Sequence, residues 1–177
     1  MSWPLSFLLF ILISCLSLAA CNKPSPEKCF GIAVLNSNML VGFANGGIER
    51  ELESPSMKMG KTKDEVLPMK RSEVIDGKIQ FVEENYEKLN GFEQTDETKD
   101  IIQNSIALHE LILPVYKNEY TQLAKLYDED TTKEEIQKNV QAIHDKYYER
   151  FKELYDKLIS SGKLYAKAND IKVNWAM

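Results

Sequence analysis

Three long segments of this 177-residue chain repeat apolar residues at steps of three and four positions, and this spacing limits the fold more than any other feature. It places the apolar side chains on one face of a helix, which must then be covered by another element. Because the connections between the segments are short, consecutive helices are predicted to run antiparallel. The three series are Ile75, Ile79, Val82, Tyr86 and Leu89; Ile102, Ile106, His109, Leu113, Tyr116, Tyr120, Leu123 and Tyr127; and Ile136, Val140, Ile143, Tyr147, Phe151, Leu154 and Leu158.

Prolines and glycines predict where these helices begin, bend and end. Proline is tolerated in a first turn, so we expect the first long helix to begin near Pro68 and to end at Gly91. Pro114 removes a backbone donor within the second series, which continues in phase on both sides, so it predicts a kink and not a break. The Ser-Ser-Gly at 160–162 predicts a stop or a bend in the last helix.

The segment 30–53 is less regular than the segments that follow it. Apolar residues keep helical spacing from Ile32 to Phe43, but three glycines between positions 42 and 47 weaken the pattern. We expect one shorter helix here, with a partly irregular packed segment as the alternative, and a flexible basic loop over 54–63. The sequence therefore predicts an all-α fold, an up-and-down helical bundle of three long helices plus one shorter N-terminal helix.

The first twenty residues carry no Asp, Glu, Lys or Arg and contain an apolar run over 5–13. A run of this length suits a signal peptide and is too short to span a bilayer, which takes about 20 residues. It is followed by Leu18-Ala19-Ala20-Cys21, an aliphatic residue, two small residues and a cysteine. This pattern resembles the lipobox of bacterial lipoproteins.

The resemblance implies that diacylglycerol is attached to the Cys21 sulfur and that the chain is cut just before this residue. Two or three acyl chains hold a protein stably on a bilayer, whereas one does not. By the same resemblance, Asn22 after the cysteine implies the outer membrane, facing the periplasm, and not the inner membrane of the cell envelope. The alternatives are an ordinary secreted protein that is cut elsewhere and an uncleaved transmembrane anchor.

These features divide the chain into three parts. By the resemblance we expect residues 1–20 to form the lipoprotein signal peptide and residues 21–29 to hold the lipidated cysteine and a Pro-rich tether. Residues 30–177 are expected to form the helical-bundle domain. Cys29 is then the one thiol left without a modification. We expect it to be a small buried hydrophobic residue, with an intermolecular disulfide as the alternative.

Charge and motifs exclude several functions. The formal net charge of −5 argues against nucleic-acid binding, which needs a cationic face. The sequence has no Gly-rich phosphate loop and no HExxH, GxSxG or CxxC motif. We therefore expect no enzyme, no catalytic residue and no cofactor. The expected partners are the lipid bilayer, through the acylated Cys21, and a protein of unknown identity.

His109 and His144 are the obvious candidates for metal binding, and the pattern argues against it. Neither histidine has a glutamate three residues before it, as the Glu-x-x-His signature of di-metal bundles requires. Antiparallel pairing of the two helices would also separate the imidazoles by about 10 Å along the bundle. We therefore predict no metal site.

Tyrosines suggest a second kind of site. A kink at Pro114 would open an aromatic groove beside Tyr116 and Tyr147, with His109 and His144 as further candidate ligand-binding residues. Two functions follow as hypotheses. The first is a non-enzymatic, membrane-anchored envelope lipoprotein that binds a protein as an accessory or inhibitory module. The alternative is a helical bundle that binds a small ligand or a metal through the Tyr-rich groove.

Overall fold

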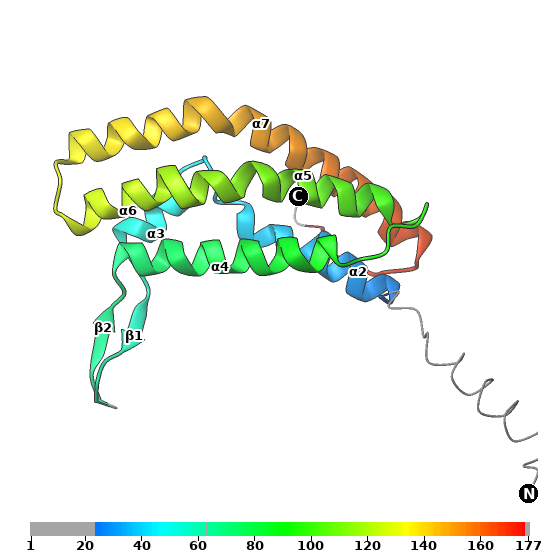
Figure 1. Cartoon of the computed structure of the whole chain (residues 1–177), viewed down its shortest axis with the longest axis horizontal. Helices are drawn as coiled ribbons and strands as arrows, with labels where there is room; N and C mark the ends of the chain where they lie inside the picture. Colours follow the sequence, from blue (N-terminus) through cyan, green and yellow to red (C-terminus); the bar gives the residue numbers. More distant parts are fainter. Residues whose placement is uncertain (1–23, 63, 176–177) are drawn as a thin grey trace, which may run out of the picture.

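The computed structural model describes residues 24–62 and 64–175 and is mostly helical, with one small two-stranded sheet (Figure 1). The expected all-α class is thus confirmed at this level. None of the helices within these residues has the length and apolar character needed to cross a bilayer. Cys21 and residues 1–20 lie outside the described residues, so the predicted signal peptide and lipid attachment stay predictions.

The long helices lie side by side along the molecule (Figure 1). Helix α4 spans Arg71–Asn90, and Gly91 follows as its cap, as predicted. Helix α5, Lys99–Val115, returns along α4 and continues through η2, Tyr116–Tyr120, into α6, Thr121–Asp128. Helix α7, Lys133–Ala168, packs on α5. The core between these helices contains most of the predicted apolar series.

Pro114 perturbs its helix without ending it. The chain remains helical on both sides of this residue, and the turn that follows, Tyr116–Tyr120, is a π-helix. Two side chains satisfy carbonyls near this turn: Asn118 donates to the Pro114 oxygen at 2.8 Å, and the Thr121 hydroxyl donates to the Tyr116 oxygen at 2.9 Å. Tyr116 and Tyr120, the first and last residues of this π turn, are both buried in the core.

The expectation of one helix over 30–53 is wrong. The segment forms α2, Pro26–Ala33, then a 3₁₀ helix η1, Leu35–Leu40, and then α3, Gly47–Glu53. Between η1 and α3 the backbone reverses tightly, with Gly46 at a φ of 84°. The backbones of Gly42 and Gly47 meet so closely that a Cβ on Gly47 would lie 2.3 Å from the Gly42 Cα. The glycines thus allow the reversal, and no continuous helix can form through it.

The expected loop over 54–63 contains the first strand of a β-hairpin. Strands β1, Met57–Met59, and β2, Val66–Pro68, pair antiparallel with Met57 opposite Pro68 and Met59 opposite Val66. Pro68 therefore ends a strand and does not begin α4, which corrects the predicted start of that helix. The alternation in Met-Lys-Met was the signal for a strand, but it covers only three residues.

The Ser-Ser-Gly at 160–162 does not stop the last helix, because α7 continues to Ala168. Gly162 has a packing role instead. A Cβ built on it would lie 2.8 Å from a methyl carbon of Val34, which follows α2. The glycine thus lets the N-terminal segment lie directly against α7.

Packed structure also begins earlier than the boundary predicted at residue 30. Helix α2 starts at Pro26, with the Ser25 side chain accepting a hydrogen bond from the Lys28 amide. Cys29 and Phe30 are fully buried, so the expectation of a buried Cys29 thiol is confirmed. Residues 26–29 of the predicted tether 21–29 therefore belong to α2.

Candidate functional site

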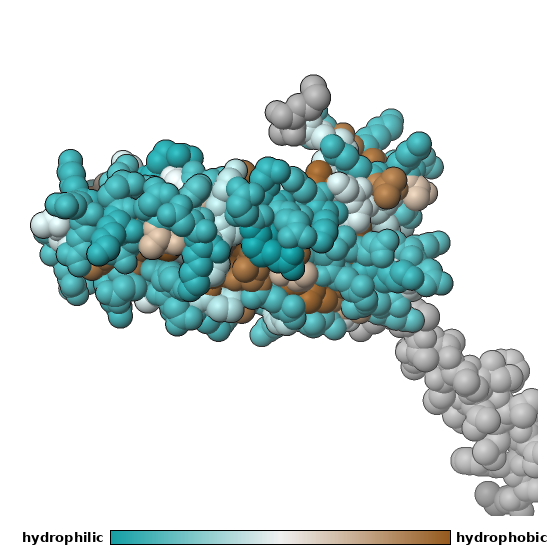
Figure 2. Space-filling model, turned by 90° about the horizontal axis from the view of Figure 1, so that it is seen from above, coloured by the Kyte–Doolittle hydropathy of each residue, from teal (hydrophilic) through white to brown (hydrophobic). Residues whose placement is uncertain are grey.

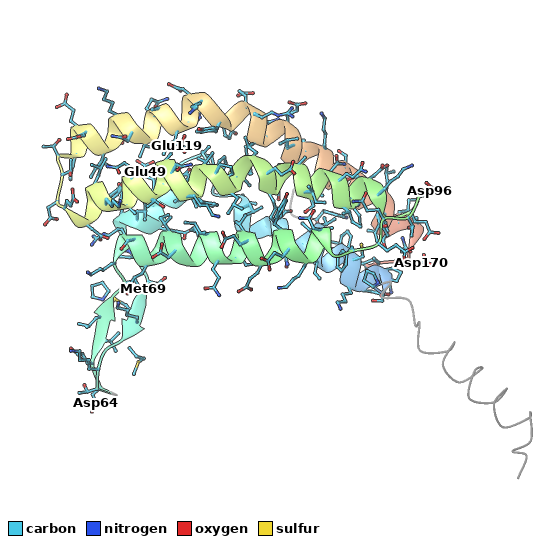
Figure 3. All side chains as sticks on the ribbon, in the orientation of Figure 1. Glu49, Asp64, Met69, Asp96, Glu119 and Asp170 are labelled. Carbon is cyan, nitrogen blue, oxygen red and sulfur yellow. The ribbon has the colours of Figure 1, made fainter. Side chains whose placement is uncertain are left out.

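The hairpin β1–β2 projects from one end of the helical body, with Asp64 at its tip and Met69 at its base (Figures 1 and 3). Residues directly opposite each other in an antiparallel pair point to the same side of the sheet. Met57, Met59, Val66 and Pro68 therefore share one face, which we call the apolar hairpin face. Met57, Met59 and Val66 are 57%, 63% and 52% exposed, so more than half of each residue on this face is open to solvent.

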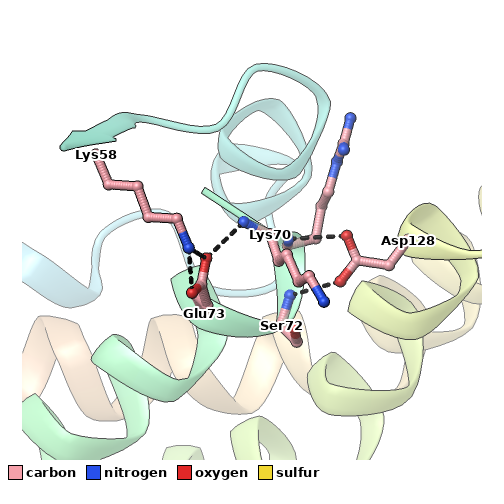
Figure 4. A network of polar contacts seen from close by, with 6 residues as sticks. Lys58, Lys70, Ser72, Glu73 and Asp128 are labelled. Carbon is pink, nitrogen blue, oxygen red and sulfur yellow. Dashed lines mark hydrogen bonds and ion pairs between the residues drawn. The ribbon is translucent and has the colours of Figure 1, made fainter. Parts of the chain in front are cut away.

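A network of charged groups attaches the base of the hairpin to α4 (Figure 4). From the other face of β1, the Lys58 ammonium bonds both carboxylate oxygens of Glu73. Glu73 also accepts the Lys70 amide at 2.8 Å, directly before the helix begins. Since Lys58 faces α4, the hairpin is held with its apolar face turned away from that helix.

Asp128, at the end of α6, completes this network from the other side. Its two carboxylate oxygens accept the amides of Arg71 and Ser72, both at 3.0 Å. These amides have no partner within α4, because they belong to its first turn. Asp128 thus satisfies two free donors and places a negative charge at the positive end of the helix.

The same contacts change the acidity of both carboxyl groups. The Lys58 ammonium, together with the Lys70 amide, holds the pKa of Glu73 below its ordinary value. Partial burial would raise the pKa of Asp128, but the hydrogen bonds from Arg71 and Ser72 outweigh it and hold the pKa below the ordinary value. Both groups therefore stay ionised at neutral pH and keep the hairpin base in place.

The predicted tyrosines Tyr116 and Tyr147 lie in one aromatic cluster around Phe43. The ring centroids of Tyr116 and Tyr147 lie 5.8 and 6.4 Å from that of Phe43, which is fully buried. Tyr147 is partly exposed and donates its hydroxyl proton to Glu119, whereas Tyr116 is completely buried. The rings of Tyr116 and Tyr147 thus both pack against Phe43.

His109 lies in a largely buried chain of hydrogen bonds that joins four elements, α2, η1, α4 and α5. Its Nδ1 lies 2.7 Å from the Ser105 oxygen, and since a carbonyl only accepts, Nδ1 carries the proton. Nε2 therefore accepts from the Asn85 amide group at 3.0 Å, which also donates to the Ile32 oxygen. Asn85 in turn accepts from Asn36 at 2.5 Å. Both ring nitrogens of His109 are thus engaged within the protein.

His144 has a different environment and takes no part in that chain. Its ring is partly exposed, stacks on Tyr148 with centroids 4.9 Å apart, and lies 3.2 Å from an Asp145 oxygen. It also lines a cavity of about 210 Å³ with Tyr120 and Glu49. Within residues 24–62 and 64–175, no three His, Cys, Asp or Glu side chains are grouped in a way that could hold a metal ion.

The surface over α7 contrasts with the apolar hairpin face. Seen from above, this side of the molecule is mostly hydrophilic, with small scattered apolar areas (Figure 2). Ion pairs between neighbouring turns of α7 cover part of it, among them Lys152 with Asp156 and Lys157 with Glu153. Such exposed pairs stabilise a solvated helix by little and give no sign of a binding site.

The hairpin is the feature that the sequence prediction missed, and the signal for it is weak. Only the alternation in Met57–Met59 and the glycine at position 60 indicate a strand and a turn.

Comparison with known proteins yields no relative of this chain: no protein family matches it, and no curated protein or solved structure matches it.

Proposed function

We propose that this protein is a non-enzymatic lipoprotein of the cell envelope that binds a protein partner through the apolar hairpin face. In this proposal Cys21 carries the acyl chains and holds the protein on the outer membrane, facing the periplasm. The body is an up-and-down bundle of three long helices, with the shorter N-terminal helices packed on it. The apolar hairpin face is the observation that carries the proposal.

A two-stranded hairpin with a bare apolar face is marginal in water by itself, which argues for a partner that covers it. The face is also presented by a firm base, since Glu73 and Asp128 hold the start of α4. Methionine suits contact surfaces, because its unbranched side chain adapts to the shape of a partner.

The charges around the hairpin favour a protein over a lipid surface. Its turn carries Lys61, Asp64 and Glu65, so both signs of charge stand at the tip. Acidic groups are unfavourable beside anionic lipid headgroups and costly inside hydrocarbon. An apolar groove with a charged rim on a protein matches this arrangement better. We therefore expect an accessory or inhibitory protein–protein contact.

Photocrosslinking in living cells tests the partner. With p-benzoylphenylalanine in place of Met59, we expect a discrete protein adduct, which the additional change Met57→Lys removes. The matched control is the same group at Leu164, an exposed apolar residue of α7 that is 73% exposed. Adducts with lipid alone, or equal protein adducts from Leu164, would refute a protein partner on the hairpin.

Mass spectrometry of the N-terminal peptide tests the anchor separately. We expect diacylglycerol on Cys21 as the first residue of the mature chain, and loss of membrane attachment in Cys21→Ser. An unmodified Cys21 in membrane-bound protein would refute the lipoprotein assignment and leave the hairpin contact to be judged by its own experiment.

A further inference from the structure

The outer backbone edge of β1 carries free hydrogen-bonding groups. In an antiparallel ladder, hydrogen-bonded and non-hydrogen-bonded residue pairs alternate along the strands. The Met69 amide donates to the Ser56 oxygen at 2.8 Å, so this pair, directly before β1, is a hydrogen-bonded one. Met57 and Met59 then fall in the non-hydrogen-bonded pairs. Their backbone N–H and C=O groups therefore point away from β2, toward the outer edge of the hairpin.

The outer edge of β2 is protected, and that of β1 is not. Pro68 lies opposite Met57 and has no N–H, so β2 offers only the Val66 amide on its outer side. Proline on an edge strand prevents the addition of a further strand, and so does a free lysine. Lys58 of β1 is not free, because Glu73 binds it. Among the described elements only β2 packs along β1 (Figure 1), so the edge of β1 is open.

The side chains of β1 indicate which residues an added strand should carry. Residues opposite each other in a pair project to the same side of the sheet, so the neighbours of Met57 and Met59 would extend the apolar hairpin face. The residue between them would lie next to Lys58. An ammonium group has three donors, and two of these bond the Glu73 carboxylate, so one remains for an acid. Residues 54–62 contain two lysines and no Asp or Glu. Charge and pattern thus fit an apolar–acidic–apolar segment.

A second copy of this chain fits the edge less well than a different protein. If two β1 strands pair antiparallel and use the outward groups of both methionines, Met57 of each copy lies opposite Met59 of the other. The same register places Lys58 directly opposite Lys58 of the second copy. Like charges in directly opposed positions are destabilising, so the charge on β1 disfavours pairing between copies.

We propose that the protein partner adds an extended segment of alternating apolar and acidic residues to the outer edge of β1, as a third strand of the sheet. The segment exchanges backbone hydrogen bonds with Met57 and Met59, and its acidic side chain bonds Lys58. Strand addition of this kind takes affinity from the backbone and specificity from alternate side chains. The inference rests on the proposed function, since it concerns the same partner, and it specifies the edge and the conformation of the bound segment.

Proline substitution on the two edges tests the proposal in living cells. The crosslinker p-benzoylphenylalanine replaces Ser56, an exposed residue directly before β1. Met57→Pro removes an outward donor and fills the edge with a ring, while the ladder bonds to β2 remain, as they do opposite at Pro68. We expect this variant to give about tenfold less adduct than the wild type, because a hydrogen bond is lost and the edge is blocked. Met57→Val keeps the amide and should give about the wild-type yield.

The matched control is Val66→Pro, which places the same ring on the outer edge of β2 and should leave the adduct yield unchanged. Met59→Pro is the second test variant and should act like Met57→Pro, with the unfolding temperature of each variant measured to show that it folds. The adduct peptide of the partner is expected to contain acidic residues between apolar ones.

Three results would overturn strand addition at β1: equal yields from Met57→Pro and Met57→Val, an equal loss in Val66→Pro, or an adduct with a second copy of this chain. The absence of any adduct from Ser56 would also overturn it. In each of these cases, a protein adduct from Met59 would leave the proposed contact through the apolar hairpin face standing. The absence of an adduct from Met59 would refute that contact itself.

Discussion

Single residues in this protein have roles that depend on their neighbours in space. Gly31, Gly77 and Gly162 all lie inside helices. Of these three glycines, only Gly162 has an atom of another segment so close that an added Cβ would overlap it. A methyl group on Gly162 would overlap Val34, and a methyl group on Gly31 would meet open space. The same chemical change therefore has opposite expected effects at the two positions.

We expect Gly162→Ala to lower the free energy of unfolding by about 1–3 kcal/mol, the usual cost of overpacking a tight contact. The control Gly31→Ala is expected to raise it by about 0.4–1 kcal/mol, because the unfolded chain loses conformational freedom. Urea unfolding followed by circular dichroism measures both values. Equal effects of the two substitutions would contradict the close contact between α7 and the segment after α2.

At the scale of elements, the start of α4 is the point where hairpin, helix and bundle are joined. Lys58 binds Glu73 from the hairpin, and Asp128 reaches the first amides of α4 from the end of α6. The orientation of the hairpin thus depends on the contact between Lys58 and Glu73 of α4 and not on the strands alone, which are three residues long each.

Asp128→Asn is expected to reduce the free energy of unfolding by about 0.5–1 kcal/mol at pH 7, the usual value of a charge at a helix end. Because the pKa of Asp128 is lowered in the folded protein, its contribution is complete above the ordinary value of 3.8 and is lost as the pH falls through the lower folded pKa. Unfolding experiments between pH 7 and pH 3 should show the two proteins converging under acid conditions. A constant difference across this range would contradict the role of the charge.

At the scale of the whole molecule, the buried chain of hydrogen bonds around His109 joins the N-terminal segment to α4 and α5. Burial lowers the pKa of His109 below its ordinary value of 6.5, despite the hydrogen bond to the Ser105 oxygen. The imidazole is therefore neutral in the folded protein at neutral pH. Protonation of Nε2 would break its hydrogen bond with the Asn85 amide group.

As the pH falls through 6.5, the unfolded chain binds more protons at His109 than the folded protein does, so stability is expected to fall with decreasing pH. The slope is at most about 1.4 kcal/mol per pH unit. We expect wild type to lose stability between pH 7.5 and pH 5.5, and His109→Gln to show a smaller loss over the same interval. Denaturant unfolding at the two pH values measures this, and equal losses would show that another group is responsible.

The sequence by itself determined the helical class and the long helices, because their apolar spacing is local and extends over many turns. It also indicated that Cys29 is buried and that the chain remains helical through Pro114. Cys21, the centre of the localisation hypothesis, is likewise a purely local pattern. Such features depend on neighbours within a few residues, and sequence alone records those neighbours.

Only the tertiary structure decided the rest, since it depends on contacts between distant residues. At the reversal the backbones of Gly42 and Gly47 approach closely, and at Gly162 the Val34 side chain lies against α7. Neither contact leaves a mark on local spacing. The three-residue strands are too short for a periodic signal. Local spacing predicts which face of a helix is buried, but the shape of what covers it is set by the whole chain.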